Sequence, residues 1–274
     1  CIEDIVALVA LYRPGPMENI PTYCEVKNGL KDRASVHPLI DHILEETQGI
    51  IVYQEQVMQI AQVMAGYSLG GADLLRRAMG KKIKEAMDAE RPKFEKGAAE
   101  NGVEAKKASE VFDLLEKFAN YGFNKSHAAA YAVVSYQTAW LKANHPVEFM
   151  AAVMNCDIHL TDKLSVYKQE VDRLGIETIP PCVNRSAATF TVDQGRVVYA
   201  LGGLKNVGVE AMRLIVEARQ TESGPEKPFV SLFDFARRCD LKRIGKRSLE
   251  MLARAGAFDE LDRNRRRVFD SLDA

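Results

Sequence analysis

Two adjacent pairs of cations lie within one short segment, residues 70–82. Arg76 and Arg77 form one pair, and Lys81 and Lys82 form the other, with glycines at 70, 71 and 80. An arginine guanidinium matches phosphate oxygens with two parallel hydrogen bonds, and a lysine ammonium adds a compact charge beside it. Glycine lets backbone N–H groups approach an anion closely. The segment therefore favours an anion with several phosphates, although a solvated helix end with basic side chains would show the same pattern.

A second group of polar residues lies in a turn that opens a helix, at residues 121–131. Ser126 is a natural N-cap, and a long run without glycine or proline follows it. Lys125 and His127 flank this cap, where the helix dipole favours negative charge. His127 and Tyr131 are four residues apart and share a helix face. A lone histidine or tyrosine at such a position would more often have a packing role. With Lys125 beside them, a nucleotide- or phosphate-binding site is a comparable interpretation.

The composition is that of an ordinary globular protein with one large or two modest domains. Of the 274 residues, 47% are hydrophobic and 27% are charged, and the formal net charge is −1. This total gives no indication of a nucleic-acid partner. Arginines and lysines nevertheless outnumber acidic residues between positions 237 and 267, and such a local excess matters more than the sum.

The five cysteines are widely spaced, and no Cys-x-x-Cys or Cys/His ligand spacing accompanies them. A zinc site is therefore not expected, and reduced thiols of a cytoplasmic protein are the simplest interpretation. The sequence contains no signal peptide and no apolar run long enough to span a bilayer, so we expect no membrane partner. Because the sequence starts without methionine inside a helical pattern, we expect a piece of a longer protein.

Apolar periodicity predicts a mainly α protein with a small β component. Helices are expected at residues 2–11, 54–64, 71–79, 83–101, 105–118, 127–142, 147–155, 164–174, 209–219, 232–239, 246–255 and 263–272. A short strand is expected at 50–53, and residues 190–192 and 197–201 flank a turn that predicts a β-hairpin. The helix at 127–142 is apolar nearly all round, which predicts that it is buried in a larger domain.

Four motifs occur in one order along the chain. They are Ala10–Pro16, Gly49–Met58, the segment 70–82 with its paired arginines, and Tyr121–Tyr131. This succession resembles the alpha subunits of bacterial DNA polymerase III, the C-family replicative polymerases. The resemblance runs along essentially the whole chain and is most specific between residues 10 and 155, because four long motifs in order are far more specific than any one of them.

The resemblance implies a multi-helix fingers domain at residues 1–160. At 161–274 it implies an extension with a β-hairpin and a helix-hairpin-helix module that binds DNA. The implied parent is a DNA-directed DNA polymerase of chromosomal replication, a nucleotidyltransferase. On that basis the triphosphate of the incoming dNTP would be bound by Arg76, Arg77, Lys125 and His127, with Tyr131 near the base or template. Lys81 and Lys82 would contact the primer–template backbone or the triphosphate, and Arg13 is a weaker candidate.

A glycine-rich turn at residues 201–208 leads into the helix expected at 209–219. Such a turn can hold a DNA phosphate with backbone N–H groups without reading the base sequence. The resemblance makes it a helix-hairpin-helix element, with DNA contacts at Lys205, Asn206 and Gly208, and it makes the segment around Gly245 and Arg247 its candidate partner. From the motif alone, a plain strand-to-helix connection is an equally good interpretation.

The acidic residues of the chain do not form an evident catalytic metal site. Nucleotidyl transfer uses two divalent metals, which polymerases commonly bind with an Asp-x-Asp pair, and this sequence has no such pair. Glu55, Asp73 and Glu85 lie on expected helices among basic residues, where ion pairing or solvation is the simpler interpretation. The resemblance places the Mg²⁺ ligands in a palm domain upstream of the matched residues, so we expect this chain alone to be inactive.

The same resemblance implies the partners. They are primer–template DNA, dNTP, the remainder of the alpha subunit and, through it, the sliding clamp and the proofreading subunit of the replicase. An alternative stays open, in which the chain is a non-catalytic helix-hairpin-helix module that grips duplex DNA; only the polymerase interpretation predicts tighter DNA binding with matched dNTP and Mg²⁺. A kinase or NTPase is poorly supported, because the sequence lacks their phosphate-binding glycine loops.

Overall fold

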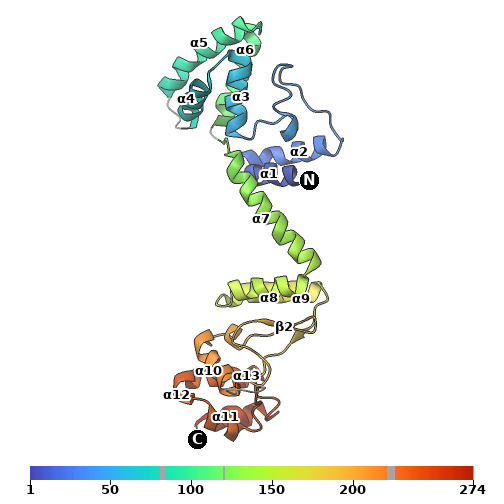
Figure 1. The fold of residues 1–274 in the computed structure, drawn as a ribbon, viewed down its shortest axis with the longest axis vertical. Helices are drawn as coiled ribbons and strands as arrows, with labels where there is room; N and C mark the ends of the chain where they lie inside the picture. The colour runs from blue at the N-terminus through green and yellow to red at the C-terminus, as the bar shows by residue number, and fades with distance from the viewer. Residues whose placement is uncertain (81–83, 120, 221–225, 274) are drawn as a thin grey trace. The chain divides into compact units, whose positions relative to one another are not determined.

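The computed structural model describes residues 1–80, 84–119, 121–220 and 226–273. The chain forms two compact units, Cys1–Thr138 and Ala139–Ala274. The described residues contain fourteen α-helices and one three-stranded sheet (Figure 1). The predicted fold class, mainly α with a small β component, is confirmed. The functional boundary at residue 160 stays a prediction.

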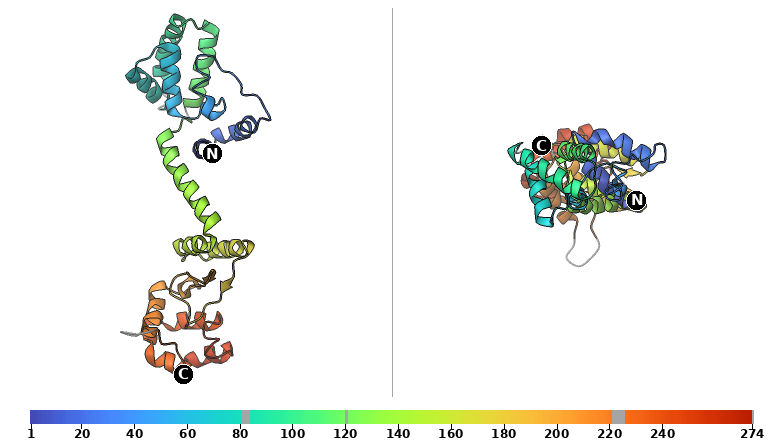
Figure 2. Two further views of the ribbon diagram at one scale, coloured as in Figure 1. Left: turned by 45° about the vertical axis from the view of Figure 1, so that its right-hand side comes forward. Right: turned by 90° about the horizontal axis from the view of Figure 1, so that it is seen from above.

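The first unit consists of helices joined by loops. Its helices are α1 (Ile2–Leu11), α2 (Ile20–Lys27), α3 (Gln54–Ala65), α4 (Leu69–Gly80), α5 (Lys84–Glu100), α6 (Ala105–Ala119) and the first part of α7 (Lys125–Asn144), with short 3-10 helices η1 (Pro16–Asn19) and η2 (Glu45–Thr47). Helix α3 packs against both α4 and α5, and α5 packs against α6 (Figures 1 and 2). These four helices therefore form one bundle.

Apolar spacing explains why α3 lies at the centre of that bundle. Val57, Ile60, Ala61 and Met64 recur at helical intervals and are at most 2% exposed. The same core takes in Leu75 of α4 and aromatic residues of α5 and α6. A second core joins α1 to the chain just before α3 and to the start of α7. The chain around residues 50–53 thus connects the two cores of the first unit.

Two local predictions for this unit are wrong. The strand expected at 50–53 is reduced to a single parallel bridge between Tyr53 and Phe123. Among the described residues, only the chain around Phe123 runs beside these residues, so a longer ladder does not form. Ser126 is not the N-cap of α7. The helix begins at Lys125, and the side-chain oxygen of Asn124 accepts the hydrogen bond from the His127 N–H at 2.8 Å.

The apolar helix α7 is mostly exposed within the described residues. Ala128 and Ala132 are buried, whereas Tyr131 is 56% exposed and Val134 is 54% exposed. The alanines provide the close contact with the core of α1, and the larger side chains project from the other faces. The sequence predicted a buried helix, but the described part of this chain leaves most of α7 exposed.

The second unit contains the sheet and the remaining helices. Its elements are the end of α7, α8 (Pro146–Cys156), α9 (Thr161–Arg173), β1 (Thr178–Ile179), β2 (Thr191–Asp193), β3 (Arg196–Val198), η3 (Leu201–Gly203), α10 (Val209–Arg219), α11 (Leu232–Arg238), α12 (Leu241–Ile244), α13 (Lys246–Arg254), α14 (Arg265–Asp270) and η4 (Ser271–Asp273). Strand β3 lies between β1, to which it is parallel, and β2, to which it is antiparallel. The predicted β-hairpin is confirmed. Its turn has φ of 46° at Gln194 and 75° at Gly195, the left-handed conformation that two-residue hairpins prefer.

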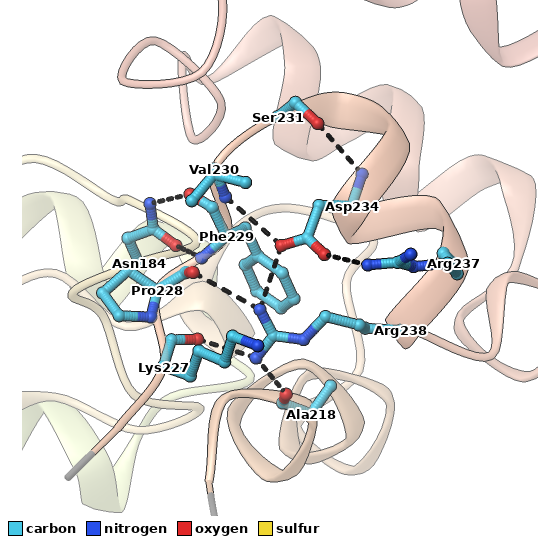
Figure 3. A network of polar contacts seen from close by, with 10 residues as sticks. All are labelled: Asn184, Ala218, Lys227, Pro228, Phe229, Val230, Ser231, Asp234, Arg237 and Arg238. Atoms are coloured by element: carbon cyan, nitrogen blue, oxygen red, sulfur yellow. Dashed lines mark hydrogen bonds and ion pairs between the residues drawn. The ribbon is translucent and has the colours of Figure 1, made fainter.

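A network of polar contacts fixes the chain that leads into α11 (Figure 3). The Arg238 guanidinium donates to the carbonyls of Ala218 at 2.6 Å and Lys227 at 2.7 Å, and it pairs with Asp234 at 3.1 Å. It also lies 4.5 Å from the ring centroid of Phe229. Arg238 belongs to the basic stretch seen in the sequence, and these contacts give it a structural role.

Candidate functional site

The first residue of α3 joins two of the four sequence motifs. The backbone N–H of Gln54 donates to the carbonyl of Phe123 at 2.9 Å, and the N–H of Phe123 donates to the carbonyl of Val52 at 3.1 Å. The Gln54 side-chain amide also donates to the carbonyl of Gly122 at 3.1 Å. Segments 49–58 and 121–131, far apart in sequence, therefore lie side by side.

A third motif is attached to the same place through Arg13. Its guanidinium donates to the carbonyls of Ala10 at 2.9 Å and Tyr121 at 2.6 Å. It stacks 4.4 Å from the ring centroid of Phe123, and burial lowers its pKa. Arg13 thus fastens the turn at residues 13–16 to the start of α7, which leaves it a structural role and weakens it further as a phosphate ligand.

The paired arginines of α4 share one carboxylate. Arg76 donates to one oxygen of Asp73 from Nε at 3.0 Å and from Nη2 at 2.7 Å, and Arg77 Nε pairs with the other oxygen at 2.8 Å. The hydrogen bond from Arg76 lowers the pKa of the Asp73 carboxyl. The expected ion pairing of Asp73 is confirmed. The Arg76 side chain is 28% exposed and that of Arg77 is 61% exposed, so both can reach solvent.

Arg76 also connects the fourth motif to the other three. Its Nη1 donates to the side-chain oxygen of Gln54 at 3.1 Å. Through Gln54 the arginine is tied to the residues just before α7, which carries Lys125 and His127. All four motifs identified in the sequence therefore lie in one hydrogen-bonded region of the first unit. Gln54 was missed by sequence reasoning, because nothing in a single glutamine indicates two distant partners.

The N-terminus of α7 is already occupied by a carboxylate of the same chain. Glu55 accepts hydrogen bonds from the backbone N–H of Lys125 at 3.0 Å and from the side-chain amide of Asn124 at 3.1 Å. The ammonium of Lys125 pairs with Glu46 at 2.5 Å. Negative charge is favoured at this helix start, as expected, but Glu55 supplies it. Glu55 was expected to be paired or solvated, and its role as a cap was missed.

Lys125 borders an open groove of about 550 Å³ in the first unit. The other residues that line it are His42, Ile43, Glu45, Glu46, Gln59 and Val63. Acidic and amide groups dominate the polar lining, so the groove itself does not favour an anion. A phosphate that engaged Lys125 would compete with Glu46 for the ammonium.

Three aromatic rings follow one another along the start of α7. The ring centroid of His127 lies 5.4 Å from that of Phe123 and 4.7 Å from that of Tyr131. The prediction that His127 and Tyr131 share a face is confirmed. Both side chains are exposed, and this ring column begins at the phenylalanine on which Arg13 stacks.

The second unit places the glycine-rich turn at the start of α10. Val207 is buried, Asn206 has a left-handed φ of 63°, and Gly208 immediately precedes the helix. A Cβ on Gly202 would lie 2.6 Å from the carbonyl oxygen of Ala188, so this glycine serves close packing. Lys205, Asn206 and Gly208 are exposed and can approach a phosphate.

A second turn of the same kind joins α12 to α13. Leu241-Lys242-Arg243-Ile244-Gly245 repeats the pattern of Leu204-Lys205-Asn206-Val207-Gly208, a similarity that sequence reasoning missed. Ile244 and Val207 are buried in the same core, and α10 packs against α12. The predicted pairing of the turn at 201–208 with the segment around Gly245 and Arg247 is therefore confirmed.

Several cations at these two turns are available for a ligand. Lys205, Lys242, Arg243 and Arg247 are exposed, and no carboxylate of the described residues pairs with any of their side chains. Most other arginines of this unit are paired, for example Arg185 with Glu260 at 2.9 Å. The two hairpin turns thus carry four exposed cations that have no carboxylate partner among the described residues.

Comparisons with known proteins agree with this arrangement. Residues 1–102 match the model of the bacterial DNA polymerase III alpha subunit finger domain, and residues 175–268 match a helix-hairpin-helix motif. The chain is 56% identical over 272 residues to the DNA polymerase III subunit alpha of Caulobacter vibrioides. This alignment covers 99% of this chain and 23% of that protein. It is 49% identical over 281 residues to that of Vibrio cholerae, covering 100% of this chain and 24% of that protein. The chain belongs to the bacterial DNA polymerase III alpha subunit family.

The polymerase III finger model covers the motifs at 10–16 and 49–58 and the arginines of α4, and the helix-hairpin-helix model covers both glycine turns. The chain spans about a quarter of the length of these relatives, 23% in the Caulobacter protein. Lys81 and Lys82 lie outside the described residues, as does the side chain of Glu85.

Among the described residues, no group of three or more histidine, cysteine, aspartate or glutamate side chains is arranged to hold a metal ion. No helix in the described ranges combines the length and the apolar character needed to cross a membrane.

Proposed function

We propose that this chain is the part of a DNA-directed DNA polymerase that binds the triphosphate of the incoming dNTP and contacts primer–template DNA. The observation that carries the proposal is the meeting of α4, α3 and the start of α7 around Gln54, which ties Arg76 to the segment of Lys125 and His127. Positive groups from separate elements can then act on one polyphosphate.

In the proposed site Arg76 and Arg77 hold the triphosphate, and Lys125 and His127 join them. Asp73 pre-orients the two arginines, since it fixes one edge of each guanidinium. The contribution of such residues is positioning and stabilisation of charge that develops at the phosphorus. Tyr131, exposed at the end of the ring column, packs near the base or template.

Mg²⁺ would be held elsewhere in the parent polymerase, by palm carboxylates, and would activate the primer hydroxyl and stabilise the leaving pyrophosphate. The family relation supports this division of labour, and so we propose that this chain alone does not catalyse nucleotidyl transfer. The partners proposed with it are the rest of the alpha subunit, the sliding clamp and the proofreading subunit, in the cytoplasm.

The helix-hairpin-helix turns contribute DNA binding in this proposal. Backbone N–H groups at Gly208 and the side chains of Lys205, Asn206 and Arg247 contact phosphates without reading bases. Lys81 and Lys82 would add contacts beside the nucleotide site. The unpaired cations at both turns support this role, and they equally support the alternative function, a DNA-binding module without a part in catalysis.

Steady-state kinetics of the full-length polymerase tests the nucleotide site. We expect Arg76→Ala or Arg77→Ala to raise the KM for dNTP or to lower kcat by about tenfold or more, since a charge-assisted phosphate contact contributes roughly 1.5–3 kcal/mol. DNA affinity measured without nucleotide should stay nearly unchanged. Lys107→Ala, which removes an exposed cation paired with Glu110 on α6, is the control and should alter neither quantity.

Unchanged kinetics in both arginine variants would contradict the triphosphate site and leave the DNA-binding module as the better account. The two functions also separate by titration of labelled primer–template in the full-length enzyme. Only the polymerase function predicts tighter binding when matched dNTP and Mg²⁺ are added.

A further inference from the structure

Gln54 is the only described residue whose side chain bonds both to Arg76 of α4 and to the segment that opens α7. Its amide oxygen accepts from Arg76 Nη1 at 3.1 Å, and its amide nitrogen donates to the carbonyl of Gly122 at 3.1 Å. A glutamine amide offers an acceptor and a donor on one rigid plane. The position of one partner therefore constrains the position of the other.

The backbone of Gln54 reinforces the same connection. Its N–H donates to the carbonyl of Phe123 at 2.9 Å, one residue beyond the carbonyl bound by the side chain. The side chain is partly buried, and hydrogen bonds shielded from water are the ones that constrain geometry most. Glu55, the next residue, holds the backbone N–H of Lys125. Two adjacent residues at the start of α3 thus hold both cationic segments.

The contacts of Arg76 leave part of its guanidinium open to a ligand. An arginine has five N–H donors, and three bonds to described residues use Nε, Nη1 and Nη2 once each. Five minus three leaves two donors, one on Nη1 and one on Nη2. Asp73 and Gln54 therefore fix the plane of the guanidinium without exhausting its capacity to bind phosphate.

We propose that Gln54 is a positioning residue for nucleotide binding. It holds the guanidinium of Arg76 in register with the start of α7, so that Arg76 and Lys125 meet the same triphosphate. Gln54 itself does not touch the nucleotide. This inference rests on the proposed function, because it requires that Arg76 binds the triphosphate.

A double-mutant cycle in the full-length polymerase tests the inference. Gln54→Met keeps the length of the side chain and removes both hydrogen bonds. We expect it to raise the KM for dNTP about fivefold with kcat changed less than about twofold, because it weakens binding of the ground state and the transition state alike. In an Arg76→Ala background the same substitution should change the KM by less than about twofold, since the residue that it positions is absent.

Two further variants keep the test decisive. Gln54→Glu retains an acceptor for Arg76 but cannot donate to the carbonyl of Gly122. If the link between Arg76 and the start of α7 positions the arginine, this variant should also raise the KM for dNTP. It replaces the methionine variant in the test if that variant does not fold. Gln62→Met, on the same helix and without a side-chain hydrogen bond to any described residue, is the matched control and should leave the KM unchanged.

The outcomes separate the inference from the proposed function. If Arg76→Ala leaves the kinetics unchanged, the triphosphate site is wrong and the role of Gln54 falls with it. If Arg76→Ala raises the KM while Gln54→Met has the same effect in both backgrounds, or none, Gln54 does not act through Arg76 and the inference alone is overturned. A KM effect that vanishes in the Arg76→Ala background supports it.

Discussion

Arg219 and Arg247 show how differently one residue type is used in this chain. The Arg219 side chain is almost wholly buried, and it donates to the carbonyls of Val183 at 2.9 Å and Ser186 at 3.1 Å. Arg247 lies exposed at the second hairpin turn. A count of basic residues treats the two as equal, but only contacts distinguish an arginine that holds the fold from one that can bind a ligand.

Substitution of Arg219 should therefore affect stability. Arg219→Met preserves much of the apolar stem and leaves two buried carbonyls without donors, so we expect a loss of about 2–4 kcal/mol in the free energy of unfolding. Denaturant unfolding of the chain measures it. Arg213→Met, at an exposed position of the same helix that is paired with Glu210, should change it by less than about 0.5 kcal/mol. Equal effects would show that the buried contacts contribute nothing.

At the scale of elements, the contact between α3 and α5 depends on one glycine. A Cβ on Gly97 would lie far inside van der Waals distance of the carbonyl group of Ala65, a backbone group that cannot swing aside. Helix propensity alone favours alanine over glycine by about 1 kcal/mol. Close packing of the two helices overrides that preference here.

Gly97→Ala should consequently destabilise the chain in spite of its better helix propensity. We expect a net loss of about 1–3 kcal/mol, because the helices must separate and the core between them loses contact. Thermal unfolding monitored by circular dichroism gives the result. Gly80→Ala, where an added Cβ would meet no described residue within 4 Å, is the control and should be neutral or stabilising. A stabilising effect at Gly97 would contradict the packing described for α3 and α5.

Sequence patterns predicted the helices well and the short elements poorly. The bounds expected for α1 and α10 agree with the structure at both ends. Strand β1 and the four-residue helix α12 were missed, because elements of two and four residues carry no readable period. Helix α2 was also missed, because Pro21 indicates a loop, whereas the structure places it in the first turn of this helix. The strand expected at 50–53 does not form, because a strand needs a neighbouring chain to pair with. In the described part of the chain, only Phe123 provides such a partner.

At the scale of the whole molecule, the cations differ in whether a carboxylate partner neutralises them. The net charge is −1, and most cations have carboxylate partners, as in Arg91 with Asp113 and Lys168 with Asp172. Lys205, Lys242, Arg243 and Arg247, at the two hairpin turns, are among the described cations without such a partner. A protein can in this way bind DNA with little net positive charge, because association depends on the local surface.

Salt dependence of DNA binding tests this picture. Lys205→Ala and Arg247→Ala in the full-length polymerase should each lower primer–template affinity on the order of fivefold, equally for different base sequences. Each should also reduce the slope of log K against log salt by about one, because each contact releases counterions. Arg213→Ala, an exposed cation with a carboxylate partner, is the matched control. An unchanged slope in both variants would exclude these turns from the DNA interface.

The sequence by itself determined the mainly α fold, the β-hairpin and the family. It could do so because helical periodicity and ordered motifs are local properties of the chain. It also predicted the ion pairing of Asp73, since opposite charges three and four residues apart meet on a helix.

Only the tertiary structure decided how those segments are connected. It showed that Gln54 ties Arg76 to the start of α7, that Glu55 rather than a ligand occupies that helix start, and that Arg13 holds a turn. These facts join residues separated by 22, 70 and 108 positions. No local pattern specifies such pairs, because hydrogen bonds between distant residues form only after the cores have brought their backbones together.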